Sequence, residues 1–269
     1  MSNGGKPVSY LKLLKQKKYR DDTGLFLAEG EKFIDEIPVG TVLEYFISQS
    51  YSAKNPGFVR HTKENVTVLK DSVFESVSAN KTPQGRIALC RKMKNSLTSL
   101  LADKGNTLYI LAEEINDPGN LGTIIRTSYA AGAAGVITSK GSAELYNPKT
   151  LQSAAGAIFK TPVIENADFN EVLPLFAQNG ITVYAADIAG AVSLFDTDFT
   201  KPCAFLLGSE ARGLSENALK LSGKRVFIPM PGGAQSLNVS AACAVFVYEA
   251  LRQRIKKEDI YYAKSNSNI

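Results

Sequence analysis

Three polar loops carry the side chains that could do chemistry in this chain of 269 residues. Residues 116–122 lead into a helical stretch with Arg126, residues 207–214 contain Glu210, and residues 228–240 combine proline, glycine and small polar side chains. An arginine near a helix start can bind a phosphate or stabilise a developing negative charge. Glycines let the backbone approach a ligand closely, and free N–H groups at a helix start suit a small polar ligand. The three loops therefore predict a ligand site.

Each of the three loops also has a simpler explanation. Arg126 lies off the apolar stripe of its helix and would serve equally as a surface residue, with Asn120 as an ordinary helix cap. Glu210 is either a charge that stabilises the start of the next helix or a functional carboxylate. Ser236 or Asn238 could cap the last helix, but a cap alone does not require the long Pro- and Gly-rich loop before it.

Apolar strands that alternate with helices would position these loops. The expected strands cover 107–112, 135–138, 181–186, 203–207 and 226–228, and the expected helices cover 121–131, 150–157, 170–178, 214–221 and 238–254. This alternation predicts an α/β fold in which a parallel sheet is covered on both faces. Ligands of such sheets bind beyond the carboxyl ends of the strands, which is where the three loops lie.

The first hundred residues predict a second, smaller α/β domain. Helices are expected over 6–20, 29–36 and 72–77, the last capped by Asp71, and strands over 25–28, 43–47, 66–69 and 86–90. The polar, basic stretch that follows is typical of a linker. The chain length favours two domains, and we place them at residues 1–94 and 106–269, with the linker at 95–105.

The net charge of +5 is concentrated in the smaller domain. Residues 1–105 hold 17 Lys and Arg against 11 Asp and Glu, a net of +6, whereas residues 106–269 hold 14 against 15, a net of −1. The densest cluster consists of Lys12, Lys15, Lys17, Lys18 and Arg20. Such a cluster can bind a polyanion by neutralising its phosphates, or it can be the solvated face of a helix.

Composition argues against several classes of protein. The single histidine, His61, leads us to expect no metal site and weakens any Ser–His–Asp triad. No GxGxxG motif is present, which argues against a dinucleotide dehydrogenase. No apolar run is long enough for a membrane helix, and the N-terminus lacks the apolar core of a signal peptide. Cys90, Cys203 and Cys243 lie in apolar runs and are expected to be buried free thiols of a cytoplasmic protein.

The three loops, in this order, resemble the motifs of the SpoU/TrmH branch of the SPOUT RNA methyltransferases. The resembling segments are 120–132, 208–214 and 228–240, and the resemblance covers residues 106–257. It implies a SPOUT α/β trefoil-knot domain that binds S-adenosylmethionine, needs no metal and forms a homodimer. The residues that would contact the cofactor are Leu207, Gly208, Ile228, Met230 and Leu237.

The N-terminal domain is similar to the family's substrate-binding domain, which resembles a small RNA-binding ribosomal protein. Residues 26–31 and 82–85 carry this similarity. It favours rRNA over tRNA as the substrate and agrees with the basic excess. The chain departs from the family at Gln152, where arginine is common, and at Gln235, where glutamate is common. These departures bear on substrate contacts.

The resemblance implies transfer of a methyl group to a ribose 2′-hydroxyl of RNA. Its candidate catalytic residues are Arg126, Asn120, Glu210, Ser236 and Asn238. The family proposal is that Arg126 activates the hydroxyl. Arginine keeps its proton at neutral pH, so holding the adjacent phosphate and stabilising the forming alkoxide is the more conservative role. Asn120 and Asn238 would position Arg126 or the ribose, and Glu210 would orient the arginine of its own or of a partner subunit.

Two alternatives stand beside this reading. One is a non-catalytic RNA-binding protein on a retained knot, which would bind RNA without binding S-adenosylmethionine. The other is a methyltransferase of the same superfamily that acts on a base nitrogen. The presence of Arg126, Glu210 and Asn238 argues against the first alternative.

Overall fold

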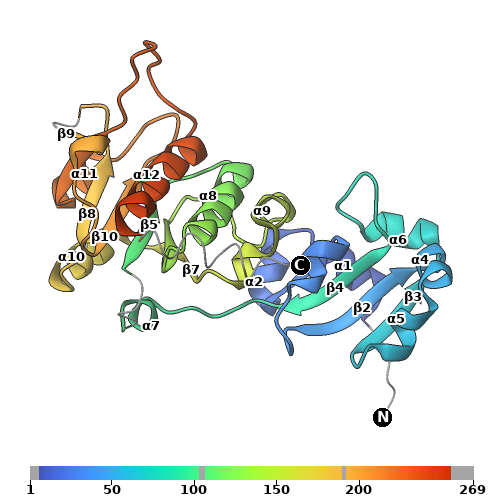
Figure 1. The fold of residues 1–269 in the computed structure, drawn as a ribbon. Helices are drawn as coiled ribbons and strands as arrows, with labels where there is room; N and C mark the ends of the chain where they lie inside the picture. The colour runs from blue at the N-terminus through green and yellow to red at the C-terminus, as the bar shows by residue number, and fades with distance from the viewer. Residues whose placement is uncertain (1–5, 103–106, 190–191, 256–269) are drawn as a thin grey trace.

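The computed structural model describes residues 6–102, 107–189 and 192–255 and contains two β-sheets, each with its own helices (Figure 1). The end of the expected linker (103–105) and the two ends of the chain (1–5 and 256–269) lie outside the described residues, as do residues 106, 190 and 191. The two sheets confirm the predicted fold class, a mixed α/β chain with a large parallel sheet in its second half.

The N-terminal sheet has four strands in the order β1-β4-β2-β3. Its elements are α1 (Val8–Leu13), α2 (Lys17–Thr23), β1 (Leu25–Glu29), α3 (Glu31–Asp35), β2 (Val42–Ser48), α4 (Gln49–Lys54), α5 (Pro56–His61), β3 (Asn65–Leu69), α6 (Asp71–Val77) and β4 (Arg86–Arg91). Strand β4 runs antiparallel to β1 and β2, whereas β3 runs parallel to β2. On one face, a cluster that includes Leu11, Phe46 and Phe74 packs α1 and α6 against the sheet.

The C-terminal sheet has seven parallel strands in the order β7-β6-β5-β10-β8-β11-β9. Its strands are β5 (Leu108–Ala112), β6 (Gly135–Ser139), β7 (Val163–Ala167), β8 (Thr182–Ala186), β9 (Val192–Ser193), β10 (Cys203–Leu207) and β11 (Lys224–Phe227). Its helices are α7 (Leu97–Ala102), α8 (Pro118–Ala130), α9 (Pro148–Ala154), α10 (Phe169–Gln178), α11 (Glu216–Leu221) and α12 (Val239–Arg254), with 3₁₀ turns η1 (Ala155–Phe159) and η2 (Leu194–Asp196).

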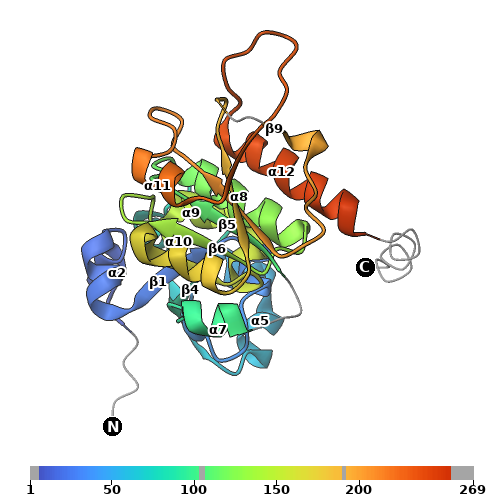
Figure 2. The same ribbon diagram turned by 90° about the vertical axis from the view of Figure 1, so that its left-hand side faces the viewer.

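Burial on both faces explains why strands β5 and β10 consist of apolar residues. Every residue of β5, β6 and β10 is buried. Alternate side chains of β10 point to opposite faces: Phe205 joins the cluster under α8 and α12, and Leu206 joins the cluster under α10 and α11. In Figure 2, helices α8, α10, α11 and α12 surround the strands of this sheet.

Several local expectations from the sequence are corrected by the structure. The helix expected over 6–20 is two helices, α1 and α2, because the chain turns after Leu13 and restarts at Lys17. Asp71 does not cap α6; its carboxylate accepts hydrogen bonds from the backbone and hydroxyl of Ser50 instead. The helix expected over 150–157 ends at Ala154, because Ala155 adopts a positive φ of 50° and a 3₁₀ turn follows.

The segment expected to be a linker contains a helix within its described part. Helix α7 buries Leu100 and Leu101 in the cluster that also holds the apolar face of α10. A linker with two buried leucines is attached to the C-terminal sheet rather than free in solvent. Helices α4 and α5 and strand β7 were not anticipated from the sequence.

All three cysteines are free and buried, as the sequence predicts. Burial raises the pKa of Cys203 to about 11 and that of Cys243 to about 12, and it raises the pKa of Cys90 further still. None of the helices among the described residues is long and apolar enough to cross a membrane. Within the same residues, no three His, Cys, Asp or Glu side chains are grouped closely enough to hold a metal ion.

Candidate active site

A cavity of about 370 Å³ opens at the carboxyl ends of β8, β10 and β11. Its walls come from five segments: Ala186, Asp187 and Ile188 at the end of β8; residues 207–210 and 212–214 at the end of β10 and beyond it; Leu219 of α11; Val226, Phe227, Ile228 and Met230 at the end of β11 and beyond it; and Ser236, Leu237, Val239, Ala242 and Phe246 before and within α12. Its size falls within the range of small-molecule sites. Its place at the carboxyl edge of a parallel sheet is where such folds bind ligands.

The structure brings all five predicted cofactor residues to this cavity. Leu207, Gly208, Ile228, Met230 and Leu237 line it, although Leu237 stands 30 residues beyond Leu207 in the chain. The last of them belongs to the exposed loop between β11 and α12, which projects away from the sheet at the top of Figure 1. The apolar side chains and the backbone groups that line this cavity suit a flat ring with polar edges.

Gly208 is required by a close approach of two backbone segments. A Cβ atom on Gly208 would lie 2.3 Å from the carbonyl carbon of Gly213 and 2.5 Å from the backbone nitrogen of Leu214. The loop closes on itself through a hydrogen bond from the Gly213 N–H to the Ser209 carbonyl (2.8 Å), and Gly213 itself has a φ of +68°. These constraints explain why both ends of this loop are glycine.

Three of the predicted catalytic residues form one hydrogen-bonded cluster beside the cavity. The side-chain nitrogen Nδ2 of Asn120 donates to the Glu210 carboxylate. The side-chain oxygen Oδ1 of Asn120 accepts a hydrogen bond of 3.1 Å from Nδ2 of Asn238. Glu210 also lines the cavity, as does Ser236. Residues separated by 90 and 118 positions in the chain thus meet at one point.

The start of α8 leaves Asn120 free for this cluster. The sequence suggested that Asn120 caps the helix, but the N-cap is Asp117, whose carboxylate accepts from the Asn120 backbone N–H at 2.8 Å. The Lys149 ammonium donates to the same carboxylate (2.7 Å) and, with the Asn120 N–H, holds the pKa of Asp117 below its usual range. Asp117 therefore takes the capping role, and the Asn120 amide points across to Glu210.

Arg126 lies apart from the other predicted catalytic residues. It is exposed in the second half of α8, and no side chain or backbone group of the described residues hydrogen-bonds to or pairs with its guanidinium. It does not line the cavity. Arg126 follows Asn120 by six positions in the helix, which corresponds to about 9 Å along the axis. The guanidinium is thus free to bind an anion.

Sequence reasoning missed two acidic residues around the site, Asp187 and Glu113. Asp187 lines the cavity directly after β8 and pairs with Arg225 at 3.4 Å. Glu113, directly after β5, accepts hydrogen bonds from the backbone and hydroxyl of Ser215 and so fixes the end of the Gly208 loop. The signal for both was available, because each is the first acidic residue after an apolar strand of a parallel sheet.

Asn238 has two separable roles, and two substitutions should distinguish them. Its side-chain oxygen Oδ1 caps α12 by accepting a hydrogen bond from the Ser240 backbone N–H (2.9 Å), while its side-chain nitrogen Nδ2 donates to Asn120. Asn238→Ala should lower the free energy of unfolding by about 1 kcal/mol through loss of the cap and should also lower the activity of the site. Asn238→Asp should keep the cap and the stability but lose the activity. Thermal unfolding and initial rates measure the two effects; equal activity of Asn238→Asp and the wild type would argue against the cluster.

Comparison with known proteins agrees with this geometry. The model of the SpoU rRNA Methylase family matches residues 107–248, and that of the MRM3-like substrate binding domain matches residues 6–88. The 23S rRNA (guanosine(2553)-2'-O)-methyltransferase RlmP of Bacillus subtilis is 32% identical over 88% of this chain and 92% of its own length. The 23S rRNA (uridine(2479)-2'-O)-methyltransferase of Streptomyces viridochromogenes is 33% identical over 71% of this chain and 68% of its own.

Solved structures resemble most of the chain as well. The crystal structure of the SpoU methyltransferase AviRb from Streptomyces viridochromogenes, in complex with the cofactor AdoMet, superposes with a TM-score of 0.82. It covers 93% of this chain and 98% of its own, at 26% sequence identity. The similarity therefore extends over both sheets.

Proposed function

Because the chain belongs to the SpoU rRNA methylase family, we propose that it transfers a methyl group from S-adenosylmethionine to a ribose 2′-hydroxyl of ribosomal RNA. The observation that carries the proposal is the cavity at the carboxyl ends of β8, β10 and β11, with the cluster of Asn120, Glu210 and Asn238 at its side. Two relatives whose names specify 2′-O-methylation of 23S rRNA support the reaction and the substrate.

The residues of the cavity fit S-adenosylmethionine. Leu207, Ile228 and Leu237 offer apolar contacts for an adenine ring, and the backbone at Gly208, which tolerates no Cβ, leaves peptide groups available to its edge. When bound, the cofactor supplies a methyl group that its sulfonium has already activated for displacement. The protein is left with the tasks of binding the substrates, orienting the hydroxyl and stabilising the negative charge that develops on it, while the hydroxyl proton passes to water.

The polar residues at the site would carry out those tasks on the ribose. Asn120 and Asn238 are held by each other and by Glu210, so they can orient a hydroxyl without rearranging. Ser236 is exposed at the cavity mouth, where a substrate would enter. The unpaired guanidinium of Arg126 would hold the phosphate next to the target ribose and stabilise the forming alkoxide, a role that does not require arginine to lose its proton.

The N-terminal domain would bind the RNA. We retain 1–94 and 106–269 as the two domains, with 95–105 between them and its helix α7 packed on the second domain, and the substrate-binding model matched over 6–88 supports the division. The basic cluster of this domain contributes less than its sequence suggests. Arg20 is buried, and Lys15 donates to the carbonyls of Ser76 and Ser78. The exposed candidates for phosphate contact in that cluster are Lys12, Lys17 and Lys18.

We further propose that the chain acts as a homodimer through α8 and α12. These helices pack together, and they expose the aromatic side chains of Tyr129 (46%) and Tyr248 (49%). Arg126 precedes Tyr129 by three residues and therefore shares its side of α8. A dimer formed on this surface would explain an arginine that stands away from its own cavity, because Arg126 of one subunit would reach the site of the other.

Mixing two inactive variants tests this arrangement. If Arg126 serves the opposite subunit, a refolded mixture of Arg126→Ala and Asn238→Asp chains contains heterodimers with one intact site. It should recover up to about a quarter of wild-type activity. The control is each variant refolded alone, and sedimentation velocity gives the mass of each. A monomer by sedimentation, or no recovery in a mixture that is dimeric, would contradict the proposal.

Two remaining expectations belong to the same proposal. The loop after β10 and residues of the segment 228–237 line one cavity, which supports the trefoil knot that the motif resemblance implies; tracing the chain in a crystal structure would test it. Three free, buried thiols suit a reducing compartment and so support a cytoplasmic enzyme; fractionating cells that express the chain would test that.

Methylation of purified RNA tests the function itself. Ribosomal RNA from cells that lack the enzyme should accept labelled methyl groups from S-adenosylmethionine, and digestion should locate the label on a ribose. Label on a base nitrogen would favour the base-methylating alternative, and label in tRNA alone would overturn the choice of substrate. RNA binding without binding of S-adenosylmethionine would favour the non-catalytic alternative.

A further inference from the structure

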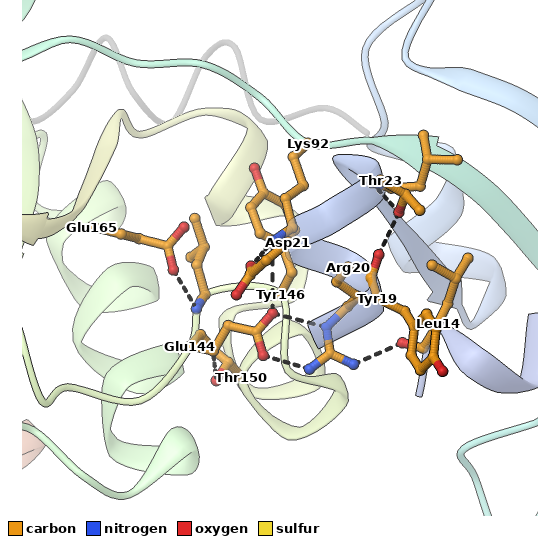
Figure 3. Close-up of polar contacts among 12 residues, drawn as sticks. Leu14, Tyr19, Arg20, Asp21, Thr23, Lys92, Glu144, Tyr146, Thr150 and Glu165 are labelled. Atoms are coloured by element: carbon orange, nitrogen blue, oxygen red, sulfur yellow. Dashed lines mark hydrogen bonds and ion pairs between the residues drawn. The ribbon is translucent and has the colours of Figure 1, made fainter. Parts of the chain in front are cut away.

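A buried ion pair joins the two domains across 124 residues of sequence. The Arg20 guanidinium donates from Nε to Glu144 Oε1 (2.8 Å) and from Nη2 to Glu144 Oε2, and its third nitrogen, Nη1, donates to the Leu14 carbonyl at 2.7 Å. The side chains of Arg20 and Glu144 are only 4% and 7% exposed. Figure 3 shows the two side chains approaching each other from α2 and from the loop before α9.

Further polar and aromatic contacts surround this pair. Lys92 lies 2.6 Å from Asp21 and 3.8 Å from Glu144, and its ammonium stands over the Tyr146 ring (Figure 3). The Tyr146 hydroxyl accepts a hydrogen bond of 2.8 Å from the Met93 backbone. Residues on both sides of the domain boundary therefore hold one another in a single arrangement.

Apolar packing lies beneath the ion pair. One face of the N-terminal sheet, including Phe26, Ala28, Ala88 and Cys90, is buried in the same cluster as the helices of the C-terminal sheet. Apolar burial stabilises contact but is not directional. A bidentate arginine–carboxylate pair has a fixed geometry. The ion pair can therefore select one orientation among those that the apolar contact would allow.

The ion pair is connected to the candidate active site by short, well-packed steps. The Glu144 carbonyl accepts a hydrogen bond from the Thr150 hydroxyl (2.9 Å) at the start of α9. In the same turn, Lys149 pairs with Asp117, the cap of α8. Helix α8 then lies so close to α9 that a Cβ on Gly122 would be 2.5 Å from the Thr150 carbonyl oxygen. Asn120 is thus positioned by the helix that Glu144 anchors.

We propose that Arg20 and Glu144 are positioning residues that fix the RNA-binding domain in one orientation relative to the methyl-transfer site. The inference rests on the proposed function, because its consequence is for the rRNA substrate. An RNA held by the N-terminal domain would present its target ribose to the cavity only while this orientation is kept. Binding of S-adenosylmethionine, which takes place within the C-terminal domain, would not depend on the pair.

The sharpest variant replaces both partners. A single substitution leaves a buried charge unpaired and endangers folding, whereas Arg20→Met with Glu144→Leu keeps comparable volume without a charge. The matched control is Lys160→Gln, which breaks another ion pair between the domains, that of Lys160 with Glu36 (3.0 Å), where both side chains are nearly half exposed. Exposed pairs contribute little to stability or orientation.

Two measurements on the full chain decide the proposal. Spin labels on Glu75→Cys and Lys201→Cys, one exposed position in each domain, report the distance between the domains. We expect the double variant to broaden that distribution and to lower kcat/KM for rRNA about tenfold. The affinity of the double variant for S-adenosylmethionine should stay at the wild-type value. The control Lys160→Gln should change neither the distance distribution nor kcat/KM.

The outcomes separate this proposal from the one on which it rests. A narrow, wild-type distance distribution in a folded double variant would overturn it, as would an unchanged kcat/KM despite a broadened distribution. Failure of the wild type to methylate rRNA would instead overturn the proposed function. In that case the distance measurement would still decide whether the pair fixes the orientation.

Discussion

Replacing Arg126 with alanine should lower kcat for rRNA methylation about 100- to 1,000-fold, the scale observed when one group that stabilises a developing anion is removed. The guanidinium is exposed on α8 and has no partner among the described residues, so its removal breaks no contact that holds the fold. Affinity for S-adenosylmethionine should remain unchanged, because Arg126 does not line the cavity.

The conservative substitution Arg126→Lys sharpens this expectation. Lysine keeps the positive charge but cannot donate two parallel hydrogen bonds to a phosphate, so it should recover only part of the lost activity. Single-turnover rates at saturating S-adenosylmethionine separate this effect from cofactor binding. Full activity of Arg126→Ala on a verified rRNA substrate would remove Arg126 from the catalytic residues.

Gly208→Ala should weaken binding of S-adenosylmethionine about 5- to 150-fold, which corresponds to the roughly 1–3 kcal/mol that forced overpacking costs. The new methyl group would meet the backbone of Gly213 and Leu214, and neither can move as a flexible side chain could. The loop would have to open, and with it the wall of the cavity. Isothermal titration with S-adenosylmethionine measures the change directly.

Gly232→Ala is the matched control for this substitution. Gly232 belongs to the neighbouring loop between β11 and α12, but a Cβ atom there would have no atom within 4 Å and its φ is not in the left-handed region. Alanine there should leave the affinity for S-adenosylmethionine within about twofold of the wild type. Equal affinities of the two variants would show that the close approach at Gly208 does not shape the cofactor site.

The parts of the fold and site that could be predicted share a local cause. Strands β5 and β10 are buried on both faces, and a run of apolar residues such as 203–207 records that burial in the sequence itself. The loop residues that follow such a strand must then lie at the carboxyl edge of the sheet. That rule alone brings Leu207 and Ile228 to one cavity.

The parts that could not be predicted depend on partners distant in the sequence. Asp117 and Asn120 are both suitable caps for α8, and the choice between them is made by Lys149 on another helix and by Glu210. Arg20 stands among lysines and resembles them in the sequence. Only Glu144, which lies in the other domain, distinguishes it as a buried residue.

The shared apolar cluster between the sheets also bears on how the chain unfolds. Phe26 packs against Tyr146 in a tilted arrangement with ring centroids 4.6 Å apart, so residues of both domains complete one core. Separating the domains would expose that surface to water, and neither would keep its full stability alone. The boundary between the domains is therefore not a boundary between cooperative units, and heat should melt the two sheets in a single transition.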